Sequence, residues 1–579
     1  MHDSRITGEH MGNFVKTTSS FANGDIAPEF YTHDNLSGLS ALVNMDVIAG
    51  GGLRRRAGLC RVAELDASAR LISFSVGQDD EYILAITAGH INVYSGATRV
   101  CDIIAPWTAA DIARIQYAQR FGTMIFVHPE YQPRTLRKTE TGFELTTFAF
   151  ARSDDDMTLH IPFMRFDDTR DIKITVTANS AGNNFATFTT SDAFWNDDCV
   201  GGTFLLMDKQ WTVHQVTSPT VAVMRTNGAF TLPTAPITDW REAAFSTRRG
   251  WPVSITFHQD RLVFGGARDY PSGVWLSGVG RHNDFDVGTG LDDQAIFITL
   301  LSRQRQQICT VVSSDNLQIL TTVGEWAIAN KPLTPSSVDI KQHTSVGSVA
   351  SRYLPPQQIE GATIFISASG RDIRELCLDE LGENYSATDL CAYAKHLMMS
   401  PTDIAYNQST RQLFVVMADG NMAVLNHNAA LNISAWSAYQ TRGQFISVAV
   451  LGDDTYVVVR RGDKYWLEKF SSDALSDGDA LSFSVFASGV PLRASGHNAA
   501  RARIRRITAR VMDTRSLFIN GARADIPNAS QSTSGYTGDV HVSQLGWARD
   551  TSVAPWTITS DDQLPITIQS VTIYGNYTI

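Results

Sequence analysis

A few side chains in this chain of 579 residues have the types and spacing to bind a metal ion. His282, Asp284 and Asp286 occupy alternate positions, so an extended segment would present all three on one face. Residues 154–156 are three consecutive aspartates, and clustered carboxylates suit calcium, but neighbouring side chains of an extended segment point to opposite faces. Such groups without a further ligand are typical of a polar surface, and we predict no metal site at either place.

Two short polar runs contain groups that also occur in functional motifs. Residues 258–261 read His-Gln-Asp-Arg and lie between two apolar runs, where a tight hairpin turn is expected. Residues 461–463 read Arg-Gly-Asp, a cell-adhesion tripeptide, and they too separate two runs typical of strands. Both runs separate apolar runs, and Gly-Asp in the second is ordinary turn chemistry, so we interpret both as turns.

The common signatures of enzymes are missing from the sequence. The glycine run 50–52 lacks the lysine and hydroxyl residue of a phosphate-binding loop, and no GxSxG or HExxH motif occurs. A glycosidase pair of carboxylates depends on separation in space, which leaves that possibility open. We therefore predict no catalytic residue, no cofactor and no metal, and an enzyme is the weaker class of function.

The net charge of the chain limits which classes of molecule it can bind tightly. With 48 basic and 59 acidic residues the formal net charge is -11, which disfavours a tight nucleic-acid-binding protein. Two local basic clusters, at 54–56 and 501–510, are typical of a solvated strand face or of a salt bridge at a subunit contact.

Cysteine usage and hydropathy indicate the compartment. The 6 cysteines are scattered without metal-ligand spacing, mostly beside apolar runs, and predict buried thiols in a reducing environment. No apolar run approaches the ~20 residues of a transmembrane helix, and the first residues lack the layout of a signal peptide. We expect assembly in the cytoplasm and no membrane insertion.

Short apolar runs separated by polar turns dominate the chain. In 253–278, two alternating apolar runs flank a turn, and a third follows a loop that contains a proline. From residue 308 onward similar units recur about every 45–55 residues, close to the ~40–50 of propeller blades. The pattern predicts an all-β fold, a β-propeller of about seven divergent blades. Ordinary antiparallel sandwiches with similar hairpins are the alternative.

Two regions interrupt the repeats and divide the chain. Residues 154–237 read as a small β domain inserted between the second and third units, and residues from about 480 to 579 as a C-terminal β region. Near the start of the chain, 31–47 read as a helix or an extended arm. The predicted division is an N-terminal arm with entry strands (1–69), first propeller blades (70–153), the inserted β domain (154–237), the remaining blades (238–479) and a C-terminal β region (480–579).

A series of short motifs runs along nearly the whole chain. They are FANGDIAPE at 21–29, NMDV at 44–47, LRRRAG at 53–58, QYAQ at 116–119, RGWP at 249–252, GEW at 324–326 and DQLPITI at 562–568. In this order they resemble the tail nozzle proteins, or tail tubular protein B, of short-tailed bacteriophages. Members of that family commonly have Arg-Pro-Gly where this chain has Arg56-Ala57-Gly58.

The resemblance implies a structural protein of the virion tail, assembled in the host cytoplasm. Nozzle proteins form homo-hexameric rings below the head-to-tail adaptor protein, and tail fibre or spike proteins dock on their sides. The ring extends the conduit through which double-stranded DNA is ejected without specific binding. The inserted domain would be the fibre dock or the nozzle tip. The candidate contacts to other subunits and the adaptor are an arm expected to be exposed (Phe21, Phe30 and Tyr31) and the basic cluster Arg54, Arg55 and Arg56.

The bulk properties of the chain agree with this reading. A propeller is stiff and has few free strand edges, which suits the wall of a tube under pressure. A net acidic protein repels DNA at short range, so DNA would not adhere to the conduit wall.

Other functions stay open from sequence. One alternative is a propeller-bearing tail enzyme that degrades surface polysaccharide, and another is the hub protein of a related short tail. A host-derived propeller that serves as an interaction module is a third, although it would lack the matching arm and C-terminal ending.

Overall fold

The computed structural model of the chain describes residues 11–32, 36–77, 80–153, 158–179, 184–379, 382, 384–478, 480–492, 501–527, 535–548 and 552–578. Nearly all of its regular structure is β. The helices are single 3-10 turns, at Pro28–Phe30, Ile112–Arg114, Asp167–Thr169, Asp197–Cys199, Lys395–Leu397 and Ala429–Leu431. None of the helices among these residues has the length and apolar character needed to cross a membrane.

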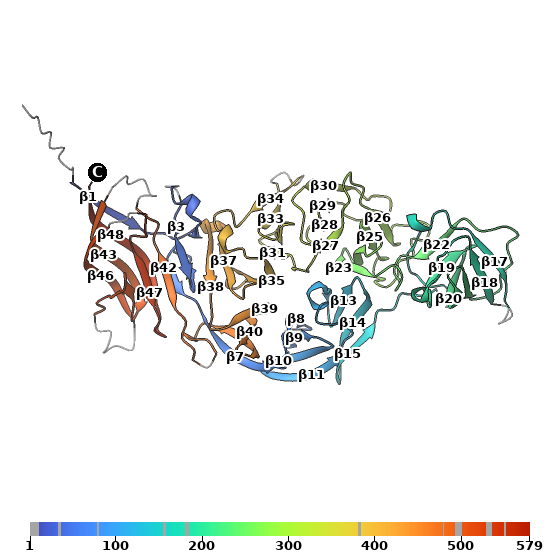
Figure 1. Ribbon diagram of the computed structural model, residues 1–579, viewed down its shortest axis with the longest axis horizontal. Helices are drawn as coiled ribbons and strands as arrows, with labels where there is room; N and C mark the ends of the chain where they lie inside the picture. The colour runs from blue at the N-terminus through green and yellow to red at the C-terminus, as the bar shows by residue number, and fades with distance from the viewer. Residues whose placement is uncertain are drawn as a thin grey trace, which may run out of the picture.

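Seven blades of four antiparallel strands form a ring in the middle of the molecule (Figure 1), which confirms the predicted propeller. Six blades are continuous in the chain and one is completed by an N-terminal strand. The continuous blades are β8 to β11 (Arg70–Ser75, Glu81–Thr87, His90–Ser95, Thr98–Ile104), β12 to β15 (Gln116–Arg120, Thr123–His128, Tyr131–Thr139, Gly142–Thr147), β23 to β26 (Pro252–His258, Arg261–Ala267, Gly273–Leu276, Ile296–Thr299), β27 to β30 (Ile308–Ser313, Leu317–Thr321, Glu325–Ile328, Ile340–Thr344), β31 to β34 (Gln357–Ile359, Ala362–Ile366, Ile373–Leu378, Tyr385–Asp389) and β35 to β38 (Pro401–Asn407, Gln412–Met417, Met422–Asn428, Ile433–Tyr439).

The ring is closed by a strand from the other end of the chain. The last blade consists of β39 (Gln444–Leu451), β40 (Asp454–Arg461) and β41 (Lys464–Ser471), and its outer strand is β7 (Gly58–Leu65). The antiparallel register pairs Tyr465 with Leu65 and Ser471 with Gly58. The first and last parts of the propeller are thereby fastened by a ladder of backbone hydrogen bonds.

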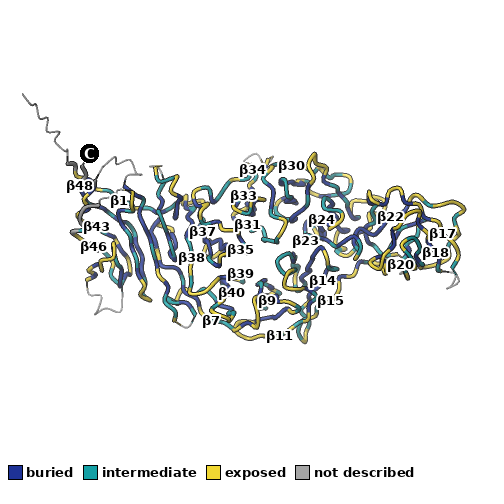
Figure 2. Tube along the Cα trace, in the orientation of Figure 1, coloured by how far each residue is buried: buried dark blue, intermediate teal, exposed yellow. Residues whose placement is uncertain are grey.

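Each blade is covered on both faces, which explains why its central strands are apolar throughout. In β36, Leu413 and Val415 pack toward the β31–β34 blade, while Phe414 and Val416 pack toward the last blade. Alternate side chains of a strand point to opposite faces, so a strand between two neighbours needs apolar residues at both. Figure 2 shows the resulting buried inner strands around the ring.

The hairpin of 253–278 has the predicted form and joins three blades. Its turn consists of Gln259 and Asp260, with φ of 44° and 59°, the left-handed conformation of tight hairpin turns. His258 Nδ1 lies 2.9 Å from Ser313 Oγ in the following blade, and Asp260 lies 2.6 Å from Arg120 in the preceding one. The predicted turn is confirmed, and its polar groups bond to both neighbouring blades.

A β-sandwich at one end of the molecule is built from both ends of the chain. One sheet has the order β46-β43-β48-β6-β5, with β1 also paired to β48. The other sheet continues the blade β35–β38 outward through β4, β42, β47, β44 and β45. With β2 and β3, which pair beside β38, it is one sheet of 11 strands that belongs to both the ring and the sandwich. The strands are β1 (Met11–Thr18), β2 (Gly24–Asp25), β3 (Gly38–Leu39), β4 (Ala41–Val43), β5 (Met45–Val47), β6 (Leu53–Arg55), β42 (Val485–Ser488), β43 (Arg501–Thr514), β44 (Phe518–Ile519), β45 (Ala522–Arg523), β46 (Tyr536–Ala548), β47 (Thr557–Ser560) and β48 (Thr567–Thr578).

This sandwich changes the interpretation of the N-terminal region. The segment 31–47 contributes short strands, and the described residues before β7 share one apolar core with β42 to β48. They form part of the C-terminal domain and are not a separate arm.

The inserted domain lies at the end of the molecule opposite the sandwich (Figure 1). It is one seven-stranded sheet of order β16-β22-β19-β20-β21-β18-β17 around its own core, which includes Phe188, Trp211 and Trp240. It leaves the ring after β15 and returns before β23, between the second and third continuous blades. Its strands are β16 (Phe163–Met164), β17 (Ile174–Ala178), β18 (Phe185–Thr190), β19 (Thr203–Leu206), β20 (Lys209–Ser218), β21 (Val221–Thr226) and β22 (Trp240–Ala243).

The predicted buried thiols are found in part. Cys199, Cys309 and Cys391 are buried, whereas Cys60 in β7 and Cys377 in β33 are exposed. In β7 the apolar Leu59 faces the core, so alternation turns Cys60 outward.

Gly24 allows the N-terminal segment to pack against the propeller. It has φ of 60°, and a Cβ there would meet Trp436 O at 2.4 Å and Trp436 N at 2.7 Å, both in the strand that β2 pairs with. Gly89 has a similar φ of 81° but open space around it.

We expect Gly24→Ala to lower stability more than Gly89→Ala. Both substitutions place an L side chain in the left-handed region, which costs about 1–2 kcal/mol, but only the first also collides with backbone. Urea denaturation and hydrogen exchange of residues 21–27 would measure the difference. Equal effects of the two variants would show that β2 is not held against β38.

Candidate functional site at the joint between propeller and sandwich

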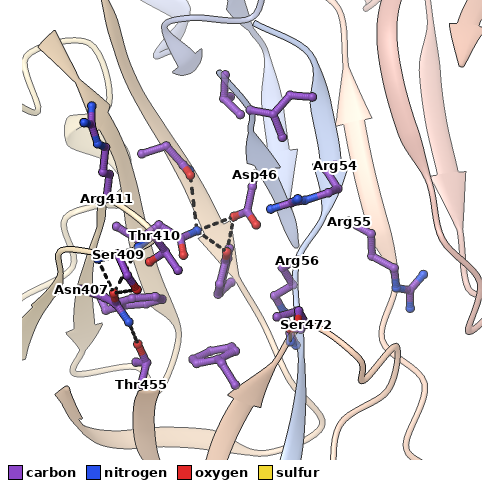
Figure 3. A pocket seen from close by; sticks show the side chains of 18 of the residues that line it. Asp46, Arg54, Arg55, Arg56, Asn407, Ser409, Thr410, Arg411, Thr455 and Ser472 are labelled. Carbon is purple, nitrogen blue, oxygen red and sulfur yellow. Dashed lines mark hydrogen bonds between the residues drawn. The ribbon is translucent and has the colours of Figure 1, made fainter. Parts of the chain in front are cut away.

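A cavity of about 860 Å³ lies where the sandwich meets the ring (Figure 3). Its walls come from β5 and β6, the ends of β36 and β37, the end of β41 and the segment before β48. Because the chain passes from β5 through β6 to β7 beside this cavity, the three arginines of the 54–56 cluster all line it. The structure therefore brings half of the predicted contact residues to one place.

Arg56 is the central tie of the joint. Its buried guanidinium is held by Asp477, with Nη1 to Oδ1 at 3.0 Å and Nη2 to Oδ2 at 2.7 Å. Its Nε donates to Asn44 Oδ1 at 2.9 Å, and two backbone carbonyls accept its remaining N–H groups. The Phe483 ring lies 3.7 Å away, with the guanidinium carbon over its face. All five donors are thus used inside the chain.

Arg55 is also internal. It donates to the carbonyl oxygens of Asp562 at 2.7 Å and Phe483 at 3.0 Å, and points away from Asp46 in Figure 3. Burial, followed by the charge of Arg56, lowers the pKa of Arg55 to about 10. The interpretation of the cluster as a subunit contact is corrected for these two residues, because both are buried and bonded within one subunit. Arg54 is exposed and points toward Asp46.

A second buried chain of hydrogen bonds joins the same segments. Asp46 Oδ1 accepts from Gln412 Nε2 at 2.9 Å and from the hydroxyl of Tyr439. Burial raises the pKa of Asp46, against the opposing effect of the Tyr439 hydrogen bond, and burial also raises the pKa of Tyr439. The carboxyl is therefore held mainly by neutral donors, and it connects β5 to β36 and β38.

The aromatic residues of the N-terminal segment divide into two groups. Phe21 is 0% exposed, contacts Trp556 with ring centroids 6.4 Å apart, and belongs to the sandwich core, so its expected exposure is wrong. Phe30 stacks edge-on against Tyr393 at 5.0 Å, and both Phe30 and Tyr31 are partly exposed. A role for these two in contacts with another subunit stays a prediction.

A chain segment crosses the inside of the propeller ring. The segment between β30 and β31 crosses the ring, where Tyr353 N donates to Ala113 O at 2.8 Å. The Tyr353 ring lies 6.1 Å from that of Tyr117 and 5.4 Å from the Arg70 guanidinium carbon. The cavity beside it measures about 20 Å³, room for about one water molecule.

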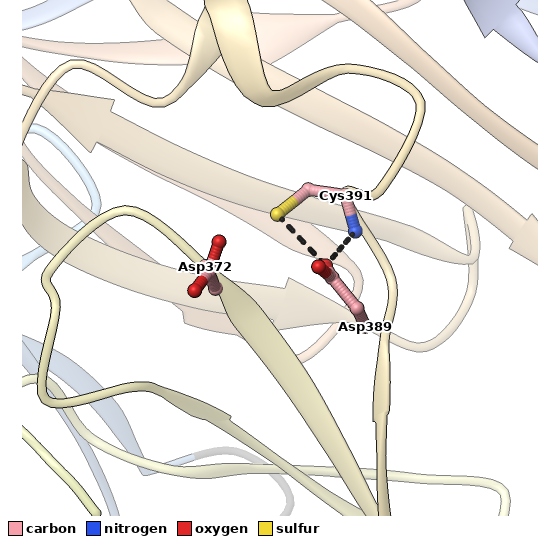
Figure 4. A group of neighbouring side chains, drawn as sticks. All are labelled: Asp372, Asp389 and Cys391. Carbon is pink, nitrogen blue, oxygen red and sulfur yellow. Dashed lines mark hydrogen bonds between the residues drawn. The ribbon is translucent and has the colours of Figure 1, made fainter. Parts of the chain in front are cut away.

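One group of metal-ligand side chains converges in the part of the chain that the structure describes: Asp372, Asp389 and Cys391 (Figure 4). Lys395 Nζ already lies 3.3 Å from Asp372 and 3.1 Å from Asp389. The Cys391 thiol donates to Asp389 at 3.3 Å, and burial raises its pKa to about 12. A metal would have to displace an ammonium and deprotonate this thiol, so the group is best explained as an ion pair.

The candidate metal ligands of the sequence do not converge. Asp284 pairs with His160 at 2.9 Å and with Arg281 at 3.1 Å. His282 instead lies 3.5 Å from Asp260. Asp286 is engaged in its own loop, where its carboxylate accepts a backbone N–H. The aspartates at 154–156 lie outside the described residues.

The Arg-Gly-Asp run is a hairpin turn, as predicted. It connects β40 to β41, and Gly462 has φ of 63°. The Arg461 side chain turns inward, with Nη2 2.6 Å from Glu468, a fully buried carboxylate. Its guanidinium is therefore not presented for adhesion.

The second basic cluster is a solvated strand face. Arg503, Arg505, Arg506 and Arg510 are exposed on β43, and apolar residues between them face the core. Arg510 lies 3.5 Å from Asp539 on the neighbouring strand. This is the interpretation that the sequence favoured.

Sequence reasoning missed the partners of Arg56. Asp477 is 421 positions away and Gln440 is 384 positions away, and neither lies in a recognisable motif. The one local signal was the position of two arginines just before a strand, beside a glycine run.

We expect Asp477→Ala to destabilise the joint by about 3–5 kcal/mol, because it leaves the Arg56 charge buried without a partner. Asp66→Ala is the matched control, since Asp66 and Arg99 are 2.8 Å apart but exposed, and such a pair contributes within about 1 kcal/mol. Denaturant unfolding and hydrogen exchange of β7 would compare them. A loss as small as that of the control would contradict the central role of the pair.

Comparisons with known proteins bear on the fold. No protein-family description and no curated protein matches the sequence. Among solved structures, a computationally designed protein, Ika8, is 10% identical, with a TM-score of 0.34 over 70% of this chain and 99% of that one. The Pan2 WD40 domain of Neurospora crassa is 9% identical, with a TM-score of 0.27 over 62% and 88% of the two chains. YCF48 bound to D1 peptide is 10% identical, with a TM-score of 0.29 over 71% and 94%. The chain is an all-β protein with the four-stranded sheets of a β-propeller, and the strand pairing carries that assignment.

Proposed function

We propose that the chain is a ring-forming structural protein of a phage tail, a nozzle or tail-tube protein. In this proposal, a homo-hexamer in the virion tail extends the DNA ejection conduit below the head-to-tail adaptor. Its sides offer docking surface for tail fibres or spikes, and it has no catalytic role. The ordered motifs from 21–29 to 562–568 suggested this family, and the architecture of the chain supports it in three ways.

The sheet shared by propeller and sandwich is the observation that carries the proposal. It runs without a break through 9 strands, from β35 in the ring to β45 at the edge of the sandwich, and the side strands β2 and β3 bring it to 11. Backbone hydrogen bonds across a sheet resist bending, and the Arg56–Asp477 pair locks the other side of the joint. A stiff unit of this kind suits the wall of a tube under internal pressure better than a protein that must open and close around a substrate.

The crossing segment supports a conduit formed between copies. The segment with Tyr353 crosses the ring to Ala113 and Tyr117, so DNA would pass beside the propellers of several subunits and not through one of them. A ring of subunits satisfies this requirement. The exposed Arg54 and the partly exposed Phe30 and Tyr31 are the predicted contact residues that remain available for neighbours.

The elongated arrangement supports separate attachment surfaces. The sandwich and the inserted domain lie at opposite ends of the molecule (Figure 1). One end can face the adaptor while the other serves as a fibre dock or nozzle tip. The inserted domain has its own core and joins the ring by two connections, as expected of a domain that acts at the periphery.

The polysaccharide-degrading enzyme is less well supported. A second cavity, of about 930 Å³, lies between the blades β12–β15 and β23–β26. Its lining includes one carboxylate, Asp284, which is bound to His160 and Arg281. Hydrolysis of a glycosidic bond by the usual mechanism requires two carboxyl groups across the bond, which this second cavity lacks. Four carboxylates line the joint cavity, but Asp46 is bound to Gln412 and Asp454 is paired with Lys469.

Electron microscopy and mass photometry of the purified full chain, alone and mixed with the phage adaptor ring, would test the proposal. We expect a six-fold ring with a central opening and a mass near six times 63.5 kDa, about 380 kDa. A particle that stays a monomer under both conditions would overturn it.

Arg54→Glu should weaken ring formation if Arg54 lies at the contact, whereas Arg137→Glu, an exposed arginine on a propeller blade, serves as the control.

A further inference from the structure

The wall of the joint cavity contains buried polar atoms without partners among the described residues. Asn426 is 8% exposed; its Oδ1 accepts from Gln412 Nε2 at 3.3 Å, but its Nδ2 has no acceptor. Two residues further on, at the end of the same strand β37, Asn428 Oδ1 has no donor, and His427 Nδ1 is also unpaired. All three residues line the cavity. Buried polar groups are nearly always paired, by protein groups or by ordered water, so these atoms mark a place where water or a ligand binds.

The required occupant must both donate and accept hydrogen bonds. The amide N–H of Asn426 needs an acceptor, and the amide oxygen of Asn428 needs a donor, at the same end of one strand. A hydroxyl group supplies both functions, whereas a phosphate dianion or carboxylate only accepts and an ammonium only donates. A ligand with several hydroxyl groups fits this pattern.

The charges around the cavity are balanced, which favours a neutral ligand. Arg56 is neutralised by Asp477 and Lys469 by Asp454, at 2.7 and 2.9 Å. The full charged lining consists of five basic side chains (Arg54, Arg55, Arg56, Arg411 and Lys469) and four carboxylates (Asp46, Asp453, Asp454 and Asp513).

The volume of the cavity and an aromatic side chain in its wall also favour a ligand with several hydroxyl groups. The volume of about 860 Å³ lies within the roughly 300–1,000 Å³ of small-molecule sites. Phe470 is partly exposed in the lining and stacks on Phe414 at 5.5 Å. A ring face of this kind can pack against the C–H face of a sugar while the amides bind its hydroxyl groups.

We propose that the joint cavity is a binding site for a neutral saccharide of one to three sugar units. Asn426 donates to the sugar, Asn428 accepts from it, and Phe470 packs against one face. The proposal does not depend on the function proposed above, because the site is formed within a single subunit.

Saturation-transfer NMR and calorimetry on the full chain, with glucose, galactose, N-acetylglucosamine and maltotriose as probes, would test the site. At least one probe should bind saturably and raise the Tm.

Asn426→Leu keeps the size of the side chain but removes its donor, and it should weaken binding tenfold or more. Asn428→Ala, at a less buried position, should also weaken binding and guards against a folding defect in the first variant. Asn421→Ala, just before the other end of β37 and outside the lining, should bind as the wild type does.

Three outcomes would contradict the proposed saccharide site. A cavity that holds water only would give no binding of any probe at tens of millimolar, which overturns the proposal. Binding of glucose 6-phosphate without binding of glucose would replace the neutral ligand with an anionic one and also overturn it. Equal binding by wild type and both cavity variants would place the sugar elsewhere. Ring formation by Asn426→Leu, measured in parallel, separates failure of this site from failure of the tail function.

Discussion

The segment 44–65 contributes strands to both the sandwich and the propeller, and the rest of the architecture depends on it. Residues 44–65 run from the sandwich into the outer strand of the last blade, so β5 and β6 complete one domain while β7 closes the other. Arg56 is buried at the crossing point, with all five of its donors bound. A buried guanidinium lowers stability unless its charge and its N–H groups are matched. The positions of Asn44, Gln440 and Asp477 are therefore set by one side chain.

The same constraint explains where the chain is polar inside. Asp46, Gln412 and Tyr439 form a hydrogen-bond chain beside Arg56, and farther around the ring Glu242 is held by Arg249 in a similar buried ion pair. Each of these groups connects segments that come from different blades or domains. Apolar packing sets the shape of the blades, since it is non-directional, whereas the hydrogen-bonded pairs fix how one unit is oriented on the next.

The sequence patterns predicted the strands of the repeated blades, but they did not predict which strands close the propeller ring. The alternation in 253–278 specifies the hairpin β23–β24 locally, and apolar runs such as 412–417 identify strands covered on both faces. The pairing of β7 with β41 joins residues about 400 positions apart, and nothing near Gly58 indicates it. The turn-rich sequence around Phe21 predicts an exposed side chain. Phe21 is buried because it packs against Trp556, which comes from the other end of the chain. At the joint, Arg55 and Arg56 were visible as a basic cluster, but their burial depends on Asp477 and Phe483, which have no local signal. Distant partners were therefore the part that the sequence could not reveal.

The shared closure also determines when this protein can fold. β7 leaves the ribosome early, whereas its partner β41 follows about 400 residues later, and the sandwich must wait for β42 to β48. Bringing such distant segments together is slow, because loop closure precedes the stabilising contacts. An incomplete polypeptide would lack the outer strands of the sandwich and the partners of its first core residues. Prematurely ended chains would thus expose apolar surface, which favours their aggregation or degradation over accumulation as folded protein.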